Sequence, residues 1–223
     1  MNGDFFESDE DETVRALRRA VGAAGAAAEP APEGASAAAA RLAERASREE
    51  LLDVAYATLD SPFGPLLVAR TPRGLVRLAF PEESEDAVLE RLAQKLSPRI
   101  LRAPGRFDGV ARELDQYFSG DRRAFETDLD WTLIGPFGRK VLGVTAAIPY
   151  GNVLSYAQVA GEAGSPRASR AAGNALGSNP IPIVIPCHRV LRTGGNLGGY
   201  GGGLERKRWL LELEGALQPR LTQ

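Results

Sequence analysis

The two side chains best suited to nucleophilic chemistry stand next to each other in this sequence. Cys187 is the only cysteine of the chain, and His188 is its only histidine. Thiolate is the nucleophilic form of cysteine, and imidazole is the side chain that most often moves protons near neutral pH. The pair therefore indicates chemistry at a single sulfur.

The order of the two residues limits how they can cooperate. A lone cysteine is more often a small buried hydrophobic residue, so the surrounding sequence has to decide its role. If residues 183–190 were extended, neighbouring side chains would point to opposite faces. A bend after Pro186 or a bridging water is then needed for His188 to act on Cys187. A cysteine protease differs, because its two residues come from distant parts of the chain.

The same counts restrict what else the chain can hold. One cysteine excludes an internal disulfide, and one cysteine with one histidine cannot supply the usual nitrogen and sulfur ligands of a zinc site. We therefore expect no metal and no cofactor.

The motifs around this pair resemble those of the O6-alkylguanine-DNA alkyltransferases. They are Ile148-Pro149-Tyr150-Gly151, Ser155-Tyr156, Arg170-Ala171-Ala172-Gly173, Asn179-Pro180, Pro186-Cys187-His188-Arg189-Val190, Gly199-Tyr200-Gly201-Gly202-Gly203-Leu204, Lys207, Leu210-Leu211 and Glu214-Gly215. The resemblance covers roughly residues 53–215 and is highly specific, because the motifs match in order and spacing.

The resemblance implies a single-turnover DNA repair protein. Such a protein flips O6-alkylguanine out of duplex DNA and transfers the alkyl group irreversibly to Cys187. In the family's arrangement His188 acts through a water as the base, Glu214 orients and charges the histidine, and Asn179 supports the turn that leads to the site. Tyr156 promotes rotation of the nucleotide and is a candidate proton donor to the departing guanine. No second thiol can receive the group, so we expect one transfer per chain.

The resemblance also implies how DNA is held. It assigns a helix over residues 167–177 to the minor groove, with Arg170 replacing the flipped nucleotide. The implied DNA-binding residues are Ser155, Tyr156, Ala168, Ser169, Arg170, Ala171 and Gly173. The implied base pocket consists of Pro182, Val190, Tyr200 and Gly201, with backbone groups of Cys187, Val190 and Gly201 reading the guanine edge. The expected partner is double-stranded DNA containing O6-alkylguanine, bound by a monomer.

Two folded regions are expected to position these residues, after an acidic, alanine-rich and partly disordered extension over residues 1–52. Short apolar segments at residues 53–60, 65–70 and 75–80, separated by turn residues, predict an antiparallel sheet. Helical spacing then links Val88 with Leu92 and Val110 with Leu114. Residues 53–130 contain no ionisable cluster that suggests chemistry, so we expect this domain to be structural.

Residues 131–223 are predicted to be mostly helical. One helix buries Val141 and Thr145, Ser155 caps a second helix over residues 156–162, and a turn at residues 164–166 opens a third over residues 167–177. The last two form a helix-turn-helix candidate. With the resemblance, the expected fold is α+β: a small antiparallel-sheet, ribonuclease-H-like domain followed by a winged-helix-like helix-turn-helix domain.

Charge is distributed unevenly along the chain. Residues 132–223 carry a net charge of +6 and residues 1–131 a net charge of −8, which fits phosphate contact by one basic face. The acidic start and the lack of a long apolar run predict a soluble cytoplasmic protein without membrane contact.

Two other functions remain open. A non-catalytic lesion-binding protein of the alkyltransferase-like kind typically has tryptophan in place of Cys187, which argues against it here. A transcriptional regulator would use the helix-turn-helix to read sequence and Cys187 as a redox sensor, although the pocket residues disfavour it. Gly138 and Leu142 also depart from the glutamine and tryptophan common in relatives, which puts local packing in doubt.

Overall fold

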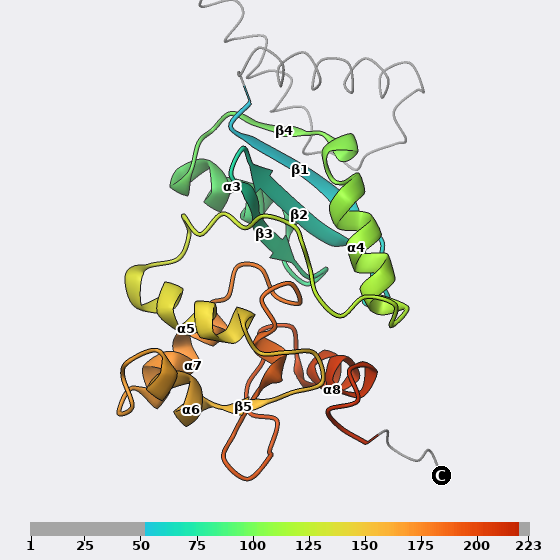
Figure 1. The fold of residues 1–223 in the computed structure, drawn as a ribbon. Coiled ribbons are helices and arrows are strands. Elements are labelled where there is room, and N and C mark those ends of the chain that lie inside the picture. Colours follow the sequence, from blue (N-terminus) through green and yellow to red (C-terminus); the bar gives the residue numbers. More distant parts are fainter. Residues whose placement is uncertain (1–51, 219–223) are drawn as a thin grey trace, which may run out of the picture. The chain divides into compact units, whose positions relative to one another are not determined.

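The computed structural model describes residues 52–218, which form a sheet region (residues 54–131) and a helical region (residues 136–216) (Figure 1). The predictions made for residues 1–51 lie outside the described residues. Between residues 52 and 218, no helix is long and apolar enough to cross a membrane.

The sheet region is built on four strands. They are β1 (Val54–Leu59), β2 (Leu66–Thr71), β3 (Gly74–Ala79) and β4 (Ile100–Arg102). β1, β2 and β3 pair antiparallel, as the sequence predicted, and the strand order is β3-β2-β1-β4. The expectation of a purely antiparallel sheet was wrong, because β4 pairs parallel with β1. The helix α3 (Glu85–Lys95) carries the chain from β3 to the opposite edge, which allows a parallel strand there.

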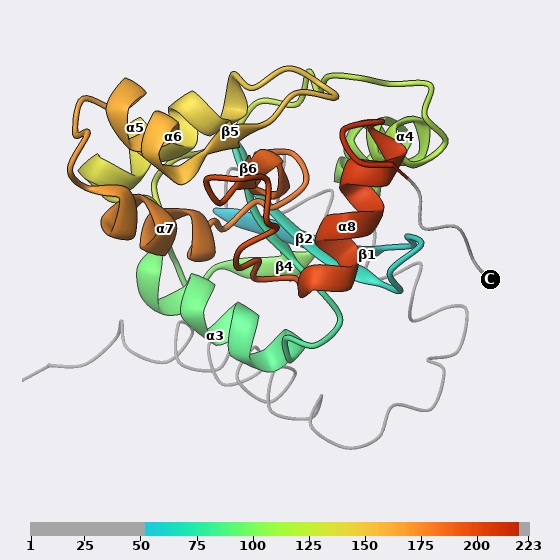
Figure 2. The same ribbon diagram turned by 90° about the horizontal axis from the view of Figure 1, so that it is seen from below.

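Helices cover both faces of this sheet. α3 packs Val88 and Leu92 on one face, and α4 (Asp108–Phe118) packs Val110 and Leu114 on the other, after a short 3₁₀ turn, η2 (Pro104–Arg106). Figure 2 shows the two helices on opposite sides of the sheet. The second face is continuous with the core of the helical region, so the two regions share one hydrophobic core.

The helical region holds four helices within the described residues. They are α5 (Pro136–Ala146), α6 (Tyr156–Glu162), α7 (Ser169–Gly177) and α8 (Leu204–Leu213). Two short strands, β5 (Leu154–Ser155) and β6 (Val190–Leu191), pair parallel and bring the ends of distant segments together. Val141, Leu142 and Thr145 of α5 are buried, so Leu142 fills a core position.

The predicted helix-turn-helix can be compared with the first residues of α6 and α7. Ser155 caps α6 as expected: its Oγ accepts from the backbone N–H of Gln158 at 3.2 Å, and the Gln158 side chain accepts from the Ser155 N–H at 2.8 Å. α7 begins two residues later than predicted, because the N–H of Ala168 closes a turn onto Ser165. Arg167, the first residue of the predicted helix, therefore lies before α7.

Candidate active site

The predicted nucleophile lies on a tight turn between two apolar segments. Residues Cys187–Arg189 form the single 3₁₀ turn η3, which starts directly after Pro186 and supplies the bend that the sequence required. The Cys187 side chain is buried, and Asn179 Nδ2 donates a hydrogen bond to its sulfur at 3.1 Å. The structure shows no direct hydrogen bond between the sulfur and His188, so a bridging group is needed for proton transfer between them.

Asn179 also holds the loop that precedes the turn. Its Nδ2 donates to the carbonyl of Ile185 at 2.8 Å, and its Oδ1 accepts from the N–H of Ile181 at 3.0 Å. Ile183 lies between Ile181 and Ile185 and is buried. Its φ of 74° is a backbone conformation that a β-branched residue rarely adopts. Such strain persists only where surrounding contacts fix the backbone. The Asn179 side chain thus supports the turn as expected and also contacts the sulfur.

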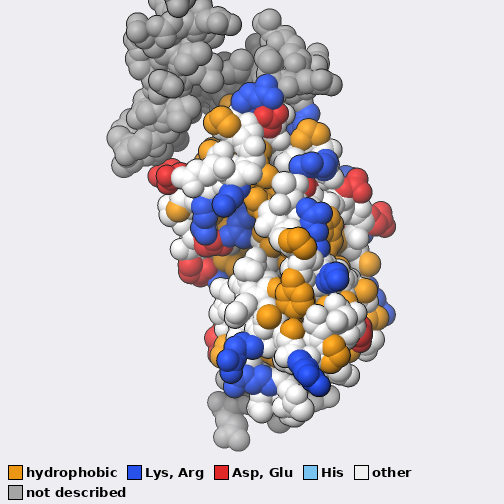
Figure 3. Space-filling view, turned by 90° about the vertical axis from the view of Figure 1, so that its left-hand side faces the viewer, with side chains coloured by type: hydrophobic (Ala, Val, Ile, Leu, Met, Phe, Trp, Pro, Cys, Tyr) orange, Lys and Arg blue, Asp and Glu red, His pale blue; other side chains and the backbone are white. Residues whose placement is uncertain are grey.

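Cys187 lies on the wall of two cavities. We call the first the α7 cavity; it is lined by Tyr156, Arg170, Gly173, Asn174, Leu176, Gly177, Cys187, Arg192, Gly199, Tyr200 and Gly201. The second, the α3 cavity, has a volume of about 370 Å³ and extends from Cys187 toward α3. Figure 3 shows the side of the molecule that carries α3 and α7, where Lys and Arg side chains gather beside acidic ones.

The predicted DNA-binding residues surround the α7 cavity. Arg170 and Ala171 are exposed on α7, and Ala168, Ser169 and Gly173 are half-buried. The Tyr156 ring would lie only 3.7 Å from a Cβ on Gly173, and its hydroxyl donates to Gly199 O at 3.2 Å. Small residues on α7 therefore leave room for Tyr156 between the helix and the glycine-rich segment.

The predicted base-pocket residues are brought together only in part. Tyr200 and Gly201 line both cavities, and Pro182 lines the α3 cavity. Val190 is fully buried and lines neither, and its carbonyl accepts from Lys207 Nζ at 2.6 Å. A direct role of Val190 in reading the base stays a prediction.

His188 is oriented by a buried carboxylate. Both His188 and Glu214 have fully buried side chains, and His188 Nε2 lies 2.9 Å from Glu214 Oε1. An ionised carboxylate can only accept, so Nε2 carries the hydrogen and Nδ1 is the basic nitrogen. Within residues 52–218 Nδ1 has no hydrogen-bond partner. The orientation predicted for Glu214 is therefore present.

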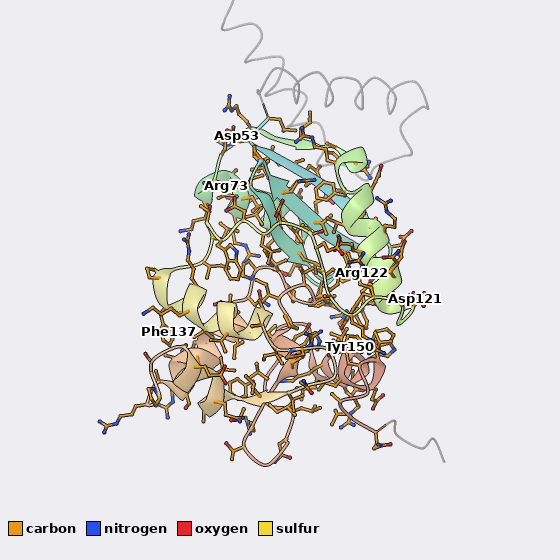
Figure 4. The ribbon with its side chains drawn as sticks, viewed as in Figure 1. Asp53, Arg73, Asp121, Arg122, Phe137 and Tyr150 are labelled. Carbon is orange, nitrogen blue, oxygen red and sulfur yellow. The ribbon has the colours of Figure 1, made fainter. Side chains whose placement is uncertain are left out.

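Two further side chains fix the carboxylate. Arg189 donates to both of its oxygens, from Nε at 2.8 Å and from Nη2 at 2.9 Å, and also donates to the carbonyl of Ile148. The Tyr117 hydroxyl donates to Glu214 Oε1 at 2.6 Å. Tyr117 belongs to α4, so the sheet region contributes a polar group to the site; that this region is otherwise structural stays a prediction. Figure 4 shows Tyr150, whose ring centroid lies 6.2 Å from that of Tyr117, below the end of α4.

These contacts determine the charge of the buried pair. Burial alone would raise the pKa of Glu214, but hydrogen bonds from His188 and Arg189 outweigh it and lower the pKa to about 2. Burial lowers the pKa of His188, which therefore stays neutral at physiological pH despite the nearby carboxylate. The site thus holds a permanent carboxylate beside a neutral base.

The sulfur is held as a thiol at rest. Burial raises the pKa of Cys187 to about 11, although the Asn179 hydrogen bond and the charge of Lys207 act in the opposite direction. Lys207 is itself fully buried, bonds only backbone carbonyls, and has its pKa lowered by burial to about 8. Its ammonium would stabilise the thiolate when the proton leaves. Proton removal must therefore accompany attack.

Sequence reasoning gave no role to Tyr117, Arg189 or Lys207. A signal for Tyr117 does exist: it continues the apolar helical face of Phe107, Val110 and Leu114, and a buried tyrosine hydroxyl usually needs a partner. Arg189 and Lys207 lie within matched motifs, but their partners come from distant segments. Among residues 52–218, no three His, Cys, Asp or Glu side chains gather closely enough to hold a metal ion.

Comparison with known proteins agrees with this geometry. The model for the "6-O-methylguanine DNA methyltransferase, ribonuclease-like domain" matches residues 54–131, and the model for the "DNA binding domain" of the same family matches residues 136–216. The methylated-DNA--protein-cysteine methyltransferase of Mycobacterium tuberculosis is 41% identical over 167 residues, covering 74% of this chain and 95% of the relative. That of Methanosarcina acetivorans is 35% identical over 163 residues, covering 72% and 98%.

Solved structures extend the match to three dimensions. The O6-methylguanine methyltransferase of M. tuberculosis superposes with a TM-score of 0.63 at 39% identity, covering 74% of this chain and 95% of that one. The M. tuberculosis protein in complex with DNA gives the same TM-score at 39% identity, covering 73% and 93%. The chain belongs to the 6-O-methylguanine DNA methyltransferase family. The α+β fold with a helical DNA-binding domain is thereby confirmed.

Proposed function

We propose that this chain is a DNA repair protein that transfers the alkyl group of O6-alkylguanine in duplex DNA to Cys187, once per molecule. The observation that carries the proposal is the buried thiol on the wall of the α7 cavity, in a family member whose His188, Glu214 and Arg189 form one hydrogen-bonded unit.

The transfer is a displacement at the alkyl carbon. The Cys187 thiol proton passes through a water to His188 Nδ1, the sulfur forms a bond to the carbon, and the bond from that carbon to guanine O6 breaks. The departing electron pair stays on guanine, which takes a proton or hydrogen bonds; the Tyr156 hydroxyl, at the same cavity, is the candidate donor. The product is a thioether, and no second thiol removes it.

Double-stranded DNA is the proposed partner, approached from its minor groove by a monomer in the cytoplasm. The flipped base enters beside Cys187, where the α7 and α3 cavities meet, with Arg170 filling the space that it leaves in the stack. Small residues along α7 (Ala168, Ser169, Ala171 and Gly173) allow close approach of the helix, and Ser155 and Tyr156 lie at the start of α6. Residues 132–223, which contain these elements, carry the positive net charge.

The redox-sensor alternative gains no support from the site. A sensor cysteine has a lowered pKa and an accessible sulfur, often beside a second cysteine. Cys187 is buried, has a raised pKa and is the only cysteine. These properties suit a nucleophile that is activated only when a substrate is aligned with its base.

The test separates binding, flipping and chemistry. Cys187→Ala should bind duplex DNA containing O6-methylguanine without transfer. Arg170→Ala should slow repair of duplex DNA by at least about tenfold but leave reaction with the free base O6-benzylguanine nearly unchanged, because the free base needs no flipping. Arg167→Ala is the matched control, since Arg167 is exposed on the same segment but lies outside the α7 cavity. Transfer by Cys187→Ala, or equal loss on both substrates with Arg170→Ala, would contradict the proposal.

A further inference from the structure

The glycine-rich segment, residues 198–203, has few side chains with which to hold its own shape. All of its residues but one are glycines, and glycine loses more conformational freedom on folding than any other residue. The exception is Tyr200, which lines both cavities beside Cys187 and whose hydroxyl has no hydrogen-bond partner among residues 52–218. The position of the Tyr200 ring must therefore be set by contacts that neighbouring elements make with the backbone of the segment.

Two consecutive residues of α8 make such contacts, at opposite ends of the segment. Lys207 Nζ donates to the carbonyl of Gly199 at 3.3 Å. Arg206 Nη1 donates to the carbonyl of Gly202 at 2.9 Å. Tyr200 lies between the two carbonyls, so α8 holds the backbone on either side of the ring.

The backbone at Gly202 is closely packed against the Tyr200 ring. A Cβ at Gly202 would lie 2.8 Å from the Tyr200 ring and 2.5 Å from the Phe80 ring. The N–H of Gly203 also donates to the carbonyl of Tyr200 at 3.1 Å, which closes a tight turn around Gly202. A shift of the Gly202 carbonyl would therefore be passed to the Tyr200 ring.

The sheet region fixes the Arg206 guanidinium. Glu82, in the turn from β3 to α3, accepts from both Nη atoms of Arg206, at 2.9 Å from Nη1. The guanidinium also lies over the rings of Phe80, at 4.7 Å, and of Phe63, at 5.6 Å. The Glu82 side chain is 65% exposed, so the pair adds little to overall stability, but a bidentate pair does fix the orientation of the arginine.

We propose that Arg206, held by Glu82, is a positioning residue for the alkyl transfer. By fixing the Gly202 carbonyl, it sets where the Tyr200 ring stands against the base that enters the site. Arg206 lines neither cavity, so it acts through the glycine-rich segment and leaves the reactivity of the thiol unchanged. The inference rests on the proposed function and adds to it a residue of the sheet region that controls how the base is held.

The test separates the placing of the base from the chemistry of the thiol. Single-turnover transfer from duplex DNA containing O6-methylguanine is measured over a range of protein concentrations, which gives the maximal rate and the half-saturating concentration. Labelling of Cys187 by methyl iodide, which carries no base, measures the thiol alone. For Arg206→Met we expect a maximal rate about fivefold lower, because a misplaced ring holds fewer flipped bases in position to react. The half-saturating concentration and the methyl iodide rate should stay as in the wild-type protein.

Glu82→Ala tests the link to the sheet region. It removes both acceptors of the guanidinium, so we expect the maximal rate to fall about threefold. Because Glu82 acts only through Arg206, combining the two substitutions should give no more than the loss from Arg206→Met alone. Arg208→Met is the matched control, since Arg208 lies on the same helix but pairs within it, with Glu212 at 3.6 Å. It should leave all three measurements unchanged.

An unchanged maximal rate with Arg206→Met would overturn the proposal, as would a methyl iodide rate that falls by the same factor or a loss confined to the half-saturating concentration. Losses from Glu82→Ala and Arg206→Met that multiply in the double variant would overturn the link between them. An equal loss with Arg208→Met would show that any charge removed from α8 slows transfer, which also contradicts the assignment. Failure of the wild-type protein to repair O6-methylguanine would instead refute the proposed function.

Discussion

The sheet region and the helical region contribute to the site in different ways. The helical region carries the proposed nucleophile Cys187, its proposed base His188 and the carboxylate of Glu214. The sheet region carries no reacting group, but its Tyr117 donates to Glu214 and its Arg77 donates to the carbonyl of Pro180 at 3.1 Å. The site is completed where the two regions meet, because the Glu214 carboxylate would lose the hydrogen bond from Tyr117 without the sheet region.

The contact between the regions is made by backbone as well as side chains. The N–H of Leu78 on β3 donates to the same Pro180 carbonyl at 2.8 Å, next to Asn179, which contacts the sulfur. Arg206 of α8 pairs with Glu82 and stacks on Phe80 at 4.7 Å. The sheet region thus holds both the segment before the nucleophile and the helix after it.

The largest effect should come from the carboxylate of the helical region. Glu214→Gln leaves the buried Arg189 without its counter-charge and weakens the orientation of His188. We expect a loss of about 3–5 kcal/mol in the free energy of unfolding and of at least about a hundredfold in transfer rate. Urea unfolding and single-turnover kinetics measure the two. Glu212→Gln, on the same helix but outside the network, is the control, and equal effects of the two substitutions would refute the assignment.

Acid should remove the stabilising contribution of the Glu214 carboxylate in the wild-type protein. Glu214 has a pKa of about 2 in the folded protein against an ordinary value of 4.5. A lowered carboxyl pKa stabilises the fold above pH 4.5, and this stability is lost as the pH falls from 4.5 toward 2, by up to about 3 kcal/mol. The unfolding free energies of wild type and Glu214→Gln should therefore converge across this window. A constant difference down to pH 3 would contradict the lowered pKa.

A smaller effect is expected from the hydroxyl that the sheet region supplies. Tyr117→Phe keeps the ring but removes one hydrogen bond to a buried carboxylate, at a cost of about 1–3 kcal/mol, and should slow transfer about tenfold. Because the lost bond favoured the charged form, the pKa of Glu214 should rise and acid unfolding should begin at higher pH. Tyr150→Phe is the matched control, since its hydroxyl donates to the carbonyl of Leu213 and not to Glu214. A transfer rate equal to that of wild type would show that the sheet region does not act on the site through Tyr117.

The smallest effect should come from Arg77. Arg77→Met removes one of two donors to the Pro180 carbonyl, and the Leu78 N–H remains, so we expect transfer to slow by about threefold with little change in overall stability. Arg73→Met is the control, because Arg73, in the turn between β2 and β3, pairs with Asp130 and donates to Thr132. A slowing as large as that of Tyr117→Phe would mean that Arg77 fixes the segment before the nucleophile more strongly than its single hydrogen bond suggests.

Local signals made much of this structure predictable. Short apolar segments between turn residues predicted the first three strands, and Ser155 marked the start of α6 as its N-cap. The motif around Cys187 and its resemblance to a known family led to the prediction of a nucleophile, a base and a carboxylate, and the structure places His188 against Glu214. Each of these features depends on residues close together in sequence or on a specific motif.

The features that were missed depend on packing or on competing local bonds. β4 has three residues, too few for an alternating pattern, and its partner lies on β1. The turn residues 164–166 predicted a helix from residue 167, but the N–H of Ala168 donates to the Ser165 carbonyl and α7 begins only at Ser169. Tyr117 lies 97 residues before Glu214, so no spacing rule connects the two. The contacts between the two regions are therefore the part of the structure that sequence patterns predict least well.

The central claim is that Cys187 accepts one alkyl group and keeps it. The direct measurement is to incubate the chain with an excess of duplex DNA containing labelled O6-methylguanine, and to determine both the label transferred per chain and the mass of the peptide that holds Cys187. We expect transfer to stop at one methyl group per molecule, with the Cys187 peptide heavier by one methyl in place of a hydrogen. Continued turnover, or a methyl group on any other residue, would contradict the account.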